Sequence, residues 1–305
     1  MHIAVVGAGA VGGFYAARLA RSGERVSVIA RGAHLRAIRE RGLLIWSPLG
    51  DHVVRIEAES DPARVGPVDL VILAVKTYNN PHVLPLLPPL CGPDTAVLTL
   101  QNGVASADAL ADAVGAGRVL AGTTYVATAI IAPGLIQQTG VHRRVILGEA
   151  FGERREVSAR AARIAEALVR ADVHAEAVPD GRVPVWEKLV YLATFAAFTG
   201  VSRQPAGAIW EDEVGRRAFL EVAAEVDAVA RAEGVPIAPD VLDRMVDYLD
   251  ALPPETRSSL LIDLQRGKPT EVEALQGEVV RRGRALGVPT PGMTALYAAL
   301  RASGA

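Results

Sequence analysis

Short apolar runs alternate with amphipathic segments along the first 178 residues of the chain. Strand-like runs occupy residues 3–6, 25–30, 68–75, 95–100, 119–131 and 145–147, and residues 43–46 and 52–56 form a predicted hairpin. Apolar positions recur with a helical period at residues 14–21, 33–41 and 155–170. Residues 68–75 are almost continuously apolar, which is typical of a strand buried on both faces of a parallel sheet. The alternation predicts a parallel sheet with helices on both of its faces.

The pattern changes near residues 179–184, whose sequence is PDGRVP. The chain beyond this point shows little strand signal. Its helical segments are separated by glycine and proline and lie at residues 185–200, 212–234, 239–250, 257–266, 272–287 and 291–302. We therefore expect an α/β domain over residues 1–178 and an all-helical domain over residues 179–305.

The composition excludes several classes of protein. A net charge of -2 argues against a nucleic-acid-binding protein, which needs a basic excess. The single cysteine, Cys91, cannot form an intrachain disulfide, so we expect a cytoplasmic protein. The longest apolar stretch, residues 189–201, is too short to span a bilayer, and no leader pattern opens the chain. The six histidines show no ligand spacing, so no metal site is expected.

A glycine motif follows the first predicted strand and opens a helix. Gly7, Gly9 and Gly12 fit the pattern G-x-G-x-x-G. In dinucleotide-binding proteins these glycines allow a tight turn, close approach to a pyrophosphate, and close helix–strand packing. Ala10 and Val11 lie at the helix N-terminus, where free N–H groups attract phosphate. The alternative is a strand–helix turn that binds no ligand.

The end of the second strand indicates which dinucleotide binds. NAD sites usually carry an acidic residue there, whereas this chain has Arg31 within the sequence IARG. A guanidinium suits the 2′-phosphate of NADP, so NADP is the expected cofactor. The alternative is a solvated surface arginine.

Polar residues follow two of the predicted parallel strands, at the edge where such sheets bind ligands. Lys76 ends the sequence AVK, and Asn102 lies in the sequence QNG. Asn102 could hydrogen-bond a carboxamide or a carbonyl, and Gly103 permits the turn. The alternatives are a solvated lysine and an ordinary Asn-Gly turn.

The helical half contributes three further candidates. Lys188 is the last charge before a long apolar run, and a partly desolvated lysine can act as a general acid near neutral pH. Ser259 could cap a helix and present N–H groups to an anion. Glu271 is expected to begin the next helix, where a carboxylate also suits the helix dipole. An ordinary first-turn lysine and a capping glutamate are the alternatives.

Taken in order, these segments resemble the ketopantoate reductase (2-dehydropantoate 2-reductase) family. The matching motifs are the glycine loop, the AVK and QNG sequences, Trp186-x-Lys188, Ser258-Ser259 with Asp263, and Pro269-Thr270-Glu271. The resemblance implies a Rossmann-type domain followed by a helical domain, and NADPH-dependent reduction of a 2-oxo acid to a 2-hydroxy acid.

The resemblance also implies a role for each of five residues. Lys188 would be the general acid, and Glu271 would assist it or bind the substrate. Lys76 and Asn102 would lie beside the nicotinamide and the substrate carbonyl, and Ser259 would hold the carboxylate.

The chain departs from the family pattern on one helix face. The family pattern Lys-x-x-x-Asn-x-x-x-Asn becomes Lys188, Leu192 and Ala196 here. In the family those amides contact the substrate, so Leu192 and Ala196 are expected to give its pocket an apolar wall. A 2-oxo acid with an apolar or bulkier side chain is then at least as good a candidate as ketopantoate.

Two other functions fit the same motifs. The first is a related dehydrogenase acting on another carbonyl or an imine, as in opine-type or hydroxy-acid dehydrogenases. The second is a non-catalytic NADP-binding sensor, which the presence of Lys188 disfavours. The helical half could also support a homodimer, and neither nucleic acid nor a membrane is expected as a partner.

Overall fold

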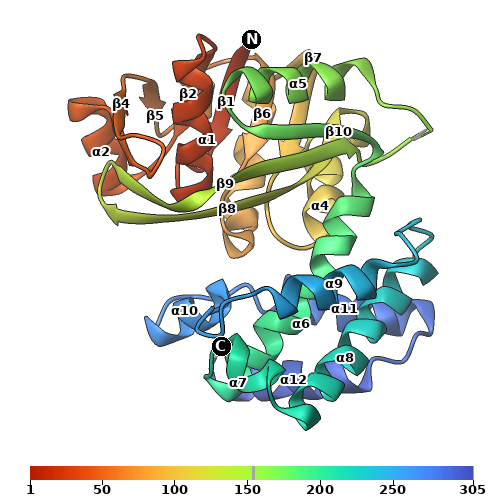
Figure 1. Ribbon diagram of the computed structural model, residues 1–305. Coiled ribbons are helices and arrows are strands. Elements are labelled where there is room, and N and C mark those ends of the chain that lie inside the picture. Colours follow the sequence, from red (N-terminus) through yellow and green to blue (C-terminus); the bar gives the residue numbers. More distant parts are fainter. Residues whose placement is uncertain (153–154, 305) are drawn as a thin grey trace. The chain divides into compact units, whose positions relative to one another are not determined.

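The computed structural model describes residues 1–152 and 155–304. The chain divides into two compact units. Unit 1 comprises Met1–Gln101 and Ser106–Arg182, and unit 2 comprises Asn102–Ala105 and Val183–Ala305. The chain therefore passes into unit 2 for four residues, returns to unit 1, and leaves it again after Arg182 (Figure 1).

A ten-stranded sheet forms the centre of unit 1. Its strands are β1 (His2–Val6), β2 (Arg25–Ile29), β3 (Leu43–Trp46), β4 (His52–Val54), β5 (Glu57–Glu59), β6 (Val68–Leu73), β7 (Cys91–Thr99), β8 (Val119–Ala132), β9 (Leu135–Glu149) and β10 (His174–Asp180). The order across the sheet is β4-β3-β9-β8-β7-β6-β1-β2-β5, and β10 also pairs with β9.

Six of these strands form the parallel core of the sheet. The order β5-β2-β1-β6-β7-β8 is parallel throughout, and it is the strand order of a dinucleotide-binding Rossmann fold. The order reverses between β1 and β6, the point at which such sheets bind ligands. The loops that follow these two strands carry the predicted glycine motif and Lys76.

The remaining strands make the sheet mixed, whereas the sequence predicted only parallel pairing beyond one hairpin. That hairpin, β3–β4, is confirmed, and β8 and β9 form a second, longer antiparallel pair (Figure 1). Strand β10 was not predicted. Among the described strands it pairs with β9 alone, and Pro179 lies where its register shifts between Val178 and Asp180. Proline is tolerated at such an irregular edge because its missing N–H leaves no partner unsatisfied.

The α-helices described in unit 1 are α1 (Ala10–Arg21), α2 (Gly32–Arg41), α3 (Asn80–Val83), α4 (Ala105–Val114, whose first residue belongs to unit 2) and α5 (Ala159–Arg170). Short 3₁₀ turns are η1 (Pro62–Arg64), η2 (Thr77–Asn79), η3 (Leu84–Leu86), η4 (Pro88–Leu90) and η5 (Ala116–Arg118). Helix α1 packs against β2, β3, β4, β8 and β9, so the sheet curls around it. Phe14, Tyr15 and Leu19 of α1 are fully buried in this core.

The described part of unit 2 is helical. Its elements are α6 (Arg182–Ser202), α7 (Ala206–Trp210), α8 (Glu213–Ala232), α9 (Val241–Asp250), α10 (Ser259–Gln265), α11 (Gln276–Leu286) and α12 (Pro291–Ala302). The predicted order of the two regions, an α/β region followed by a helical one, is therefore confirmed. Helix α6 is buried along most of its length, with Trp186, Leu189 and Val190 almost inaccessible to solvent.

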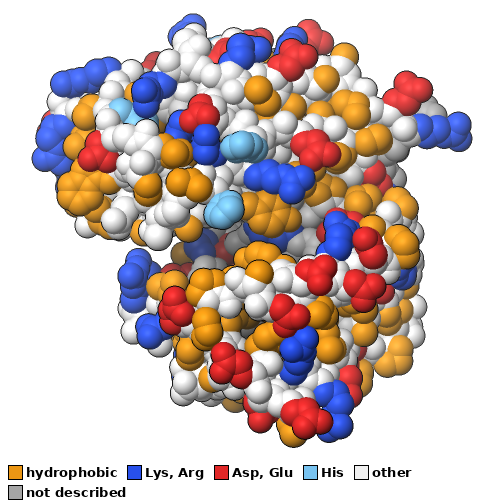
Figure 2. All heavy atoms as spheres, viewed as in Figure 1, with side chains coloured by type: hydrophobic (Ala, Val, Ile, Leu, Met, Phe, Trp, Pro, Cys, Tyr) orange, Lys and Arg blue, Asp and Glu red, His pale blue; other side chains and the backbone are white. Residues whose placement is uncertain are grey.

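Charged side chains of both signs are interspersed over the face of the molecule seen in Figure 2. This mixture agrees with the small net charge of the chain. No basic stripe of the kind that follows a nucleic-acid backbone is visible on that face.

Candidate functional site

The glycine motif adopts the geometry of a dinucleotide loop. Gly7 has a φ of +98°, and a Cβ atom there would lie 2.6 Å from Cγ1 of Val75. A Cβ atom on Gly12 would lie 2.1 Å from the carbonyl oxygen of Gly7 and 2.9 Å from Cβ of Ala74. A Cβ atom on Gly9 would meet nothing within 4 Å. Packing within unit 1 thus requires glycine at the first and third positions, whereas the second faces open space that a ligand can approach.

Helix α1 begins immediately after this open position. Gly9 is its N-cap, with no side-chain hydrogen bond to the helix end and no acidic residue in the first turn. Ala10 and Val11, the first two residues of the helix, are half-buried. The N–H groups of this first turn lack intrahelical acceptors, so the turn is suited to binding a phosphate.

Arg31 is the N-cap of α2 and is exposed to solvent. It lies two residues beyond the end of β2, and neither Ala30 nor Gly32 beside it is acidic. The guanidinium is therefore positioned near the strand end where a dinucleotide carries its ribose.

Lys76 lies at the N-terminus of η2, three residues after β6 ends, and is half-buried. Gln101, two residues beyond the end of β7, anchors the same loop. Its Nε2 donates to the carbonyl oxygen of Val75 at 2.8 Å and to Oδ1 of Asn80 at 2.7 Å. The sequence offered only the QNG motif as a signal for this glutamine.

Asn102, Lys188 and Glu271 come together in unit 2. Nζ of Lys188 donates a hydrogen bond of 3.0 Å to Oδ1 of Asn102. Burial lowers the pKa of Lys188 to about 8, and the nearby carboxylate of Glu271 acts in the opposite direction. In this cluster, the ammonium group of Lys188 can lose its proton near neutral pH.

The turn that carries Glu271 is packed against the Asn102 segment. Gly103 has a φ of +89°, and a Cβ atom there would lie 2.6 Å from the carbonyl oxygen of Ala274. Glycine is therefore required beside Asn102, as the predicted turn implied, and for a second reason that the sequence did not reveal.

Glu271 does not begin a helix, so this prediction was wrong. Helix α11 starts at Gln276, and the carbonyl oxygen of Glu271 accepts hydrogen bonds from the N–H groups of Ala274 and Leu275 in a preceding turn. The Glu271 side chain is only 6% exposed. A buried carboxylate at this place is not explained by helix capping.

Ser259 does not cap a helix either. The N-cap of α10 is Ser258, whose Oγ accepts from the N–H of Leu261 at 3.0 Å and hydrogen-bonds to Oγ1 of Thr199 at 2.7 Å. Ser259 is the exposed first residue of α10. The cap is displaced by one residue because Ser258 is the serine that α6 and α10 bury between them.

Leu192 and Ala196 differ in accessibility. Leu192 is half-buried one helical turn beyond Lys188, whereas Ala196 is fully buried. Tyr191, beside Leu192, stacks on Phe195 with ring centroids 5.2 Å apart and meets Tyr248 of α9 edge-on at 4.9 Å. The surface next to Lys188 is therefore apolar and partly aromatic.

The predicted residues thus form two groups. The glycine loop, Arg31 and Lys76 belong to unit 1, whereas Asn102, Lys188, Leu192, Ala196, Ser259 and Glu271 belong to unit 2. Within unit 2, Asn102, Lys188 and Glu271 interact, whereas the Thr199–Ser258 hydrogen bond beside Ser259 lies further along α6.

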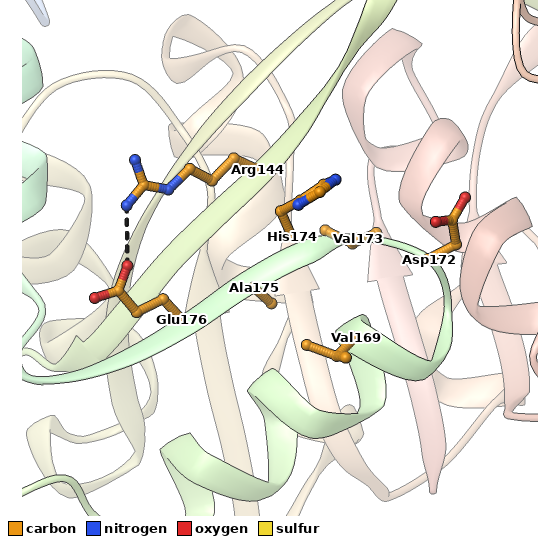
Figure 3. A pocket seen from close by; sticks show the side chains of 7 residues that line it. All are labelled: Arg144, Val169, Asp172, Val173, His174, Ala175 and Glu176. Atoms are coloured by element: carbon orange, nitrogen blue, oxygen red, sulfur yellow. Dashed lines mark hydrogen bonds and ion pairs between the residues drawn. The ribbon is translucent and has the colours of Figure 1, made fainter.

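A surface pocket of unit 1 includes none of these residues. It is lined by Arg144, Val169, Asp172, Val173, His174, Ala175 and Glu176 (Figure 3). Arg144 and Glu176 form an ion pair of 2.9 Å across its rim. Asp172, which also lines the pocket, pairs with Arg18 and Arg143. Because these charges are paired and no predicted site residue lines it, the pocket is not part of the candidate site.

No helix in residues 1–152 and 155–304 is both long and apolar enough to cross a membrane. The same residues contain no group of three or more His, Cys, Asp or Glu side chains that could hold a metal ion.

Comparison with known proteins identifies the family. The profile of the family described as ketopantoate reductase PanE/ApbA matches residues 3–152, and the one described as ketopantoate reductase PanE/ApbA C terminal matches residues 182–304. The 2-dehydropantoate 2-reductase of Mesorhizobium japonicum is 33% identical over 322 residues, covering 99% of this chain and 97% of the relative.

Solved structures agree with this assignment. The crystal structure of 2-dehydropantoate 2-reductase from Geobacter metallireducens has a TM-score of 0.92 and 33% identity, and covers 99% of this chain and 100% of the other. The ternary structure of D-mandelate dehydrogenase with NADH and anilino(oxo)acetate has a TM-score of 0.89, covers 99% of this chain and 98% of the other, and at 23% identity shares the fold alone. The two profile matches span most of the chain, and the chain belongs to the ketopantoate reductase family.

Proposed function

We propose that the protein is an NADPH-dependent reductase that converts a 2-oxo acid with an apolar side chain into the 2-hydroxy acid. The observation that carries the proposal is the Lys188 ammonium, held by Asn102 beside Glu271 with its pKa lowered to about 8. Membership of the ketopantoate reductase family and the relatives named 2-dehydropantoate 2-reductase support a 2-oxo acid as the substrate.

Lys188 acts as the general acid. Reduction of a carbonyl group develops negative charge on its oxygen, and a nearby ammonium both stabilises that charge and donates the proton. A pKa of about 8 leaves the amine largely protonated at neutral pH and makes proton transfer easier than from an ordinary lysine. General acid catalysis of this kind typically contributes about 10²–10⁴-fold.

Asn102 and Glu271 maintain the charged form of this lysine. The carboxamide oxygen of Asn102 accepts one N–H of the ammonium and fixes its direction. The carboxylate of Glu271 favours the ammonium form and offsets part of the effect of burial. The amine that remains after proton transfer regains its proton from solvent.

Unit 1 contains the groups that fit a dinucleotide. The open position at Gly9 and the first turn of α1, with Ala10 and Val11, would hold the pyrophosphate. The exposed guanidinium of Arg31 would bind the 2′-phosphate, which favours NADPH over NADH. Lys76 would lie beside the nicotinamide, and the bound cofactor supplies the hydride.

The lysine content of the chain supports these roles. The chain has three lysines, Lys76, Lys188 and Lys268, and the rest of its 32 lysine and arginine residues are arginines. Arginine cannot lose a proton at ordinary pH, whereas a buried lysine can. Lysine therefore occupies two positions of the candidate site although the chain uses arginine for most positive charges.

The apolar surface beside Lys188 supports the proposal that the substrate has an apolar side chain. Leu192 replaces an amide of the family pattern, and Tyr191 with Tyr248 extends the same surface. No amide is available from Leu192 for the hydroxyl of ketopantoate. A branched or aromatic 2-oxo acid loses no hydrogen bond on this surface and gains apolar contact.

The test measures the oxidation of NADPH with each 2-oxo acid of a panel as substrate, and the loss of NADPH absorbance reports turnover. The panel contains ketopantoate, pyruvate, 2-oxoisovalerate and phenylpyruvate, each with and without an added amine. Turnover that needs no amine supports a carbonyl reductase, and amine-dependent turnover indicates an imine reductase. Tight NADPH binding with no turnover on any member would favour a non-catalytic sensor and overturn the proposal.

A further inference from the structure

Gln101 is buried at the point where the chain passes from one unit to the other. It is the last residue of the first segment of unit 1, and Asn102, the next residue, belongs to unit 2. Its side chain is 6% exposed. Its backbone N–H donates to Oγ1 of Thr99 at 3.2 Å, which turns the chain as β7 ends.

The side-chain amide of Gln101 uses both of its N–H groups. One donates to the carbonyl oxygen of Val75 at 2.8 Å, and the other to Oδ1 of Asn80 at 2.7 Å. Val75 directly precedes Lys76, and Asn80 follows η2. The short segment that carries Lys76 is therefore held at both of its ends by one amide.

The backbone of Gln101 leads directly to a second candidate group. Asn102 accepts the hydrogen bond from Nζ of Lys188, and Gly103 beyond it packs on the carbonyl of Ala274. Gln101 therefore holds the Lys76 segment through its side chain, and the next residue in the chain, Asn102, is the acceptor for Lys188. A shift of Gln101 would move both.

We propose that Gln101 is a positioning residue, which holds Lys76 in place through its side chain and the carboxamide of Asn102 against Lys188 through its backbone. The roles in turnover and in NADPH binding rest on the proposed function, whereas the effect on Lys188 rests on its hydrogen bond to Asn102 alone. Gln101 acts through Lys76 and Asn102 and contacts neither substrate nor reacting atoms. It fixes the geometry on which both lysines depend.

The variant Gln101→Leu tests this role, because it keeps the size of the side chain and removes both donated hydrogen bonds. The matched control is Gln138→Leu, which removes another buried glutamine of unit 1 that accepts from Ser47 and donates to His142. Both variants lose a buried amide and its bonds, so a general loss of stability affects them alike.

The primary measurement is the titration of Lys188 by NMR in protein labelled with ¹³C-lysine. Only three lysines contribute signals, and Lys76→Arg and Lys268→Arg assign them. We expect the Lys188 midpoint to fall by about 0.5 pH unit or more in Gln101→Leu, because a displaced Asn102 stabilises the ammonium less, and to stay in place in the control. The carboxylate of Glu271, which acts on the pKa of Lys188, is unchanged in both variants.

The second measurement is the dissociation constant for NADPH, which requires no substrate. We expect affinity to fall about threefold or more in Gln101→Leu, because the Lys76 segment loses both of its anchors, and to remain near the wild-type value in the control. An unchanged Lys188 midpoint together with unchanged NADPH affinity in folded Gln101→Leu would overturn the proposal. So would equal changes in the control.

A second pair of variants covers the case in which Gln101→Leu does not fold. Asn80→Asp keeps an acceptor for Nε2 of Gln101, whereas Asn80→Leu removes it. We expect wild-type NADPH affinity for the first and weakened affinity for the second. Equal affinities in this pair would contradict the proposed anchoring of the Lys76 segment. A lack of turnover on every 2-oxo acid would contradict the proposed function but leave both binding and titration results in force.

Discussion

Lys188 and Asn102 are joined by a hydrogen bond of 3.0 Å although they lie 86 positions apart in the sequence. Asn102 is part of the four-residue segment that the α/β half of the chain contributes to the helical unit. The group that sets the direction of the Lys188 ammonium therefore comes from the end of a parallel strand. Local sequence around Lys188 gives no indication of this partner.

Replacement of Lys188 tests the general acid. In Lys188→Ala we expect kcat to fall by about 10²-fold or more, with NADPH affinity largely retained. Lys188→Arg keeps a positive charge that cannot lose its proton, so kcat should stay low there as well. A near-wild-type kcat in either variant on the best substrate would remove Lys188 from the proposed mechanism.

Glu271 is tested by Glu271→Gln, which keeps the shape of the buried side chain and removes its charge. Because the carboxylate favours the ammonium, its loss should lower the pKa of Lys188 further and reduce kcat at neutral pH. A melting curve measured on the same variant separates this effect from a loss of stability. Unchanged turnover with an unchanged pH profile would show that Glu271 does not act on Lys188.

The pH dependence of kcat follows from the pKa of Lys188. A general acid must be protonated, so kcat should be constant below a pH of about 8 and decline above it. Asn102→Ala removes an acceptor that favours the ammonium, and the decline should then begin at lower pH. The check is kcat as a function of pH with saturating substrate. A decline that starts at higher pH in Asn102→Ala would be inconsistent with this arrangement.

Arg31→Ala tests the choice of cofactor. Because the guanidinium is expected to bind only the 2′-phosphate, the variant should bind NADPH more weakly and NADH almost unchanged. Dissociation constants for both cofactors measure this difference. Equal weakening of both, or of neither, would show that Arg31 does not bind the 2′-phosphate.

Leu192→Asn tests the apolar wall. The wild-type protein should use the best apolar 2-oxo acid with a kcat/KM equal to or above that for ketopantoate. The variant should shift this ratio towards ketopantoate by up to about tenfold, the value of one hydrogen bond of about 0.5–1.5 kcal/mol. Addition of Ala196→Asn places an amide in a fully buried position, so the double variant should also be less stable. A wild-type preference for ketopantoate by tenfold or more would contradict the prediction.

The sequence was sufficient for the repeating elements of the fold and insufficient for its irregular ones. Strong apolar runs such as residues 68–75 predicted β6 because both faces of that strand are buried. Residues 174–180 alternate weakly and contain Pro179, so the sequence predicts no strand there, although they form β10 at the side of β9. Helix α4 was missed because its residues are mostly small, with Leu110 and Ser106 as its only buried positions.

The candidate site was predictable to the extent that its residues belong to motifs. The motif order selected Lys188, Asn102 and Glu271, but no spacing could show that Lys188 and Asn102 are in contact. The start of α11 at Gln276 was missed because Pro269 and Thr270 resemble a helix beginning, whereas the chain forms a further turn. The sequence gives no indication that Gln101 positions other residues, because this role depends on two partners distant in the sequence.

The excursion of residues 102–105 into the helical unit limits how this protein can be recombined with its relatives. A chimera joined only after Arg182 would combine Lys188 and Glu271 from one parent with Asn102 and Gly103 from the other. The close approach of Gly103 to the Ala274 carbonyl leaves no space for a larger residue from a second parent. Exchange of the helical half therefore requires these four residues to be exchanged with it. The part of the gene that must be exchanged as one unit is thus split into two separate segments.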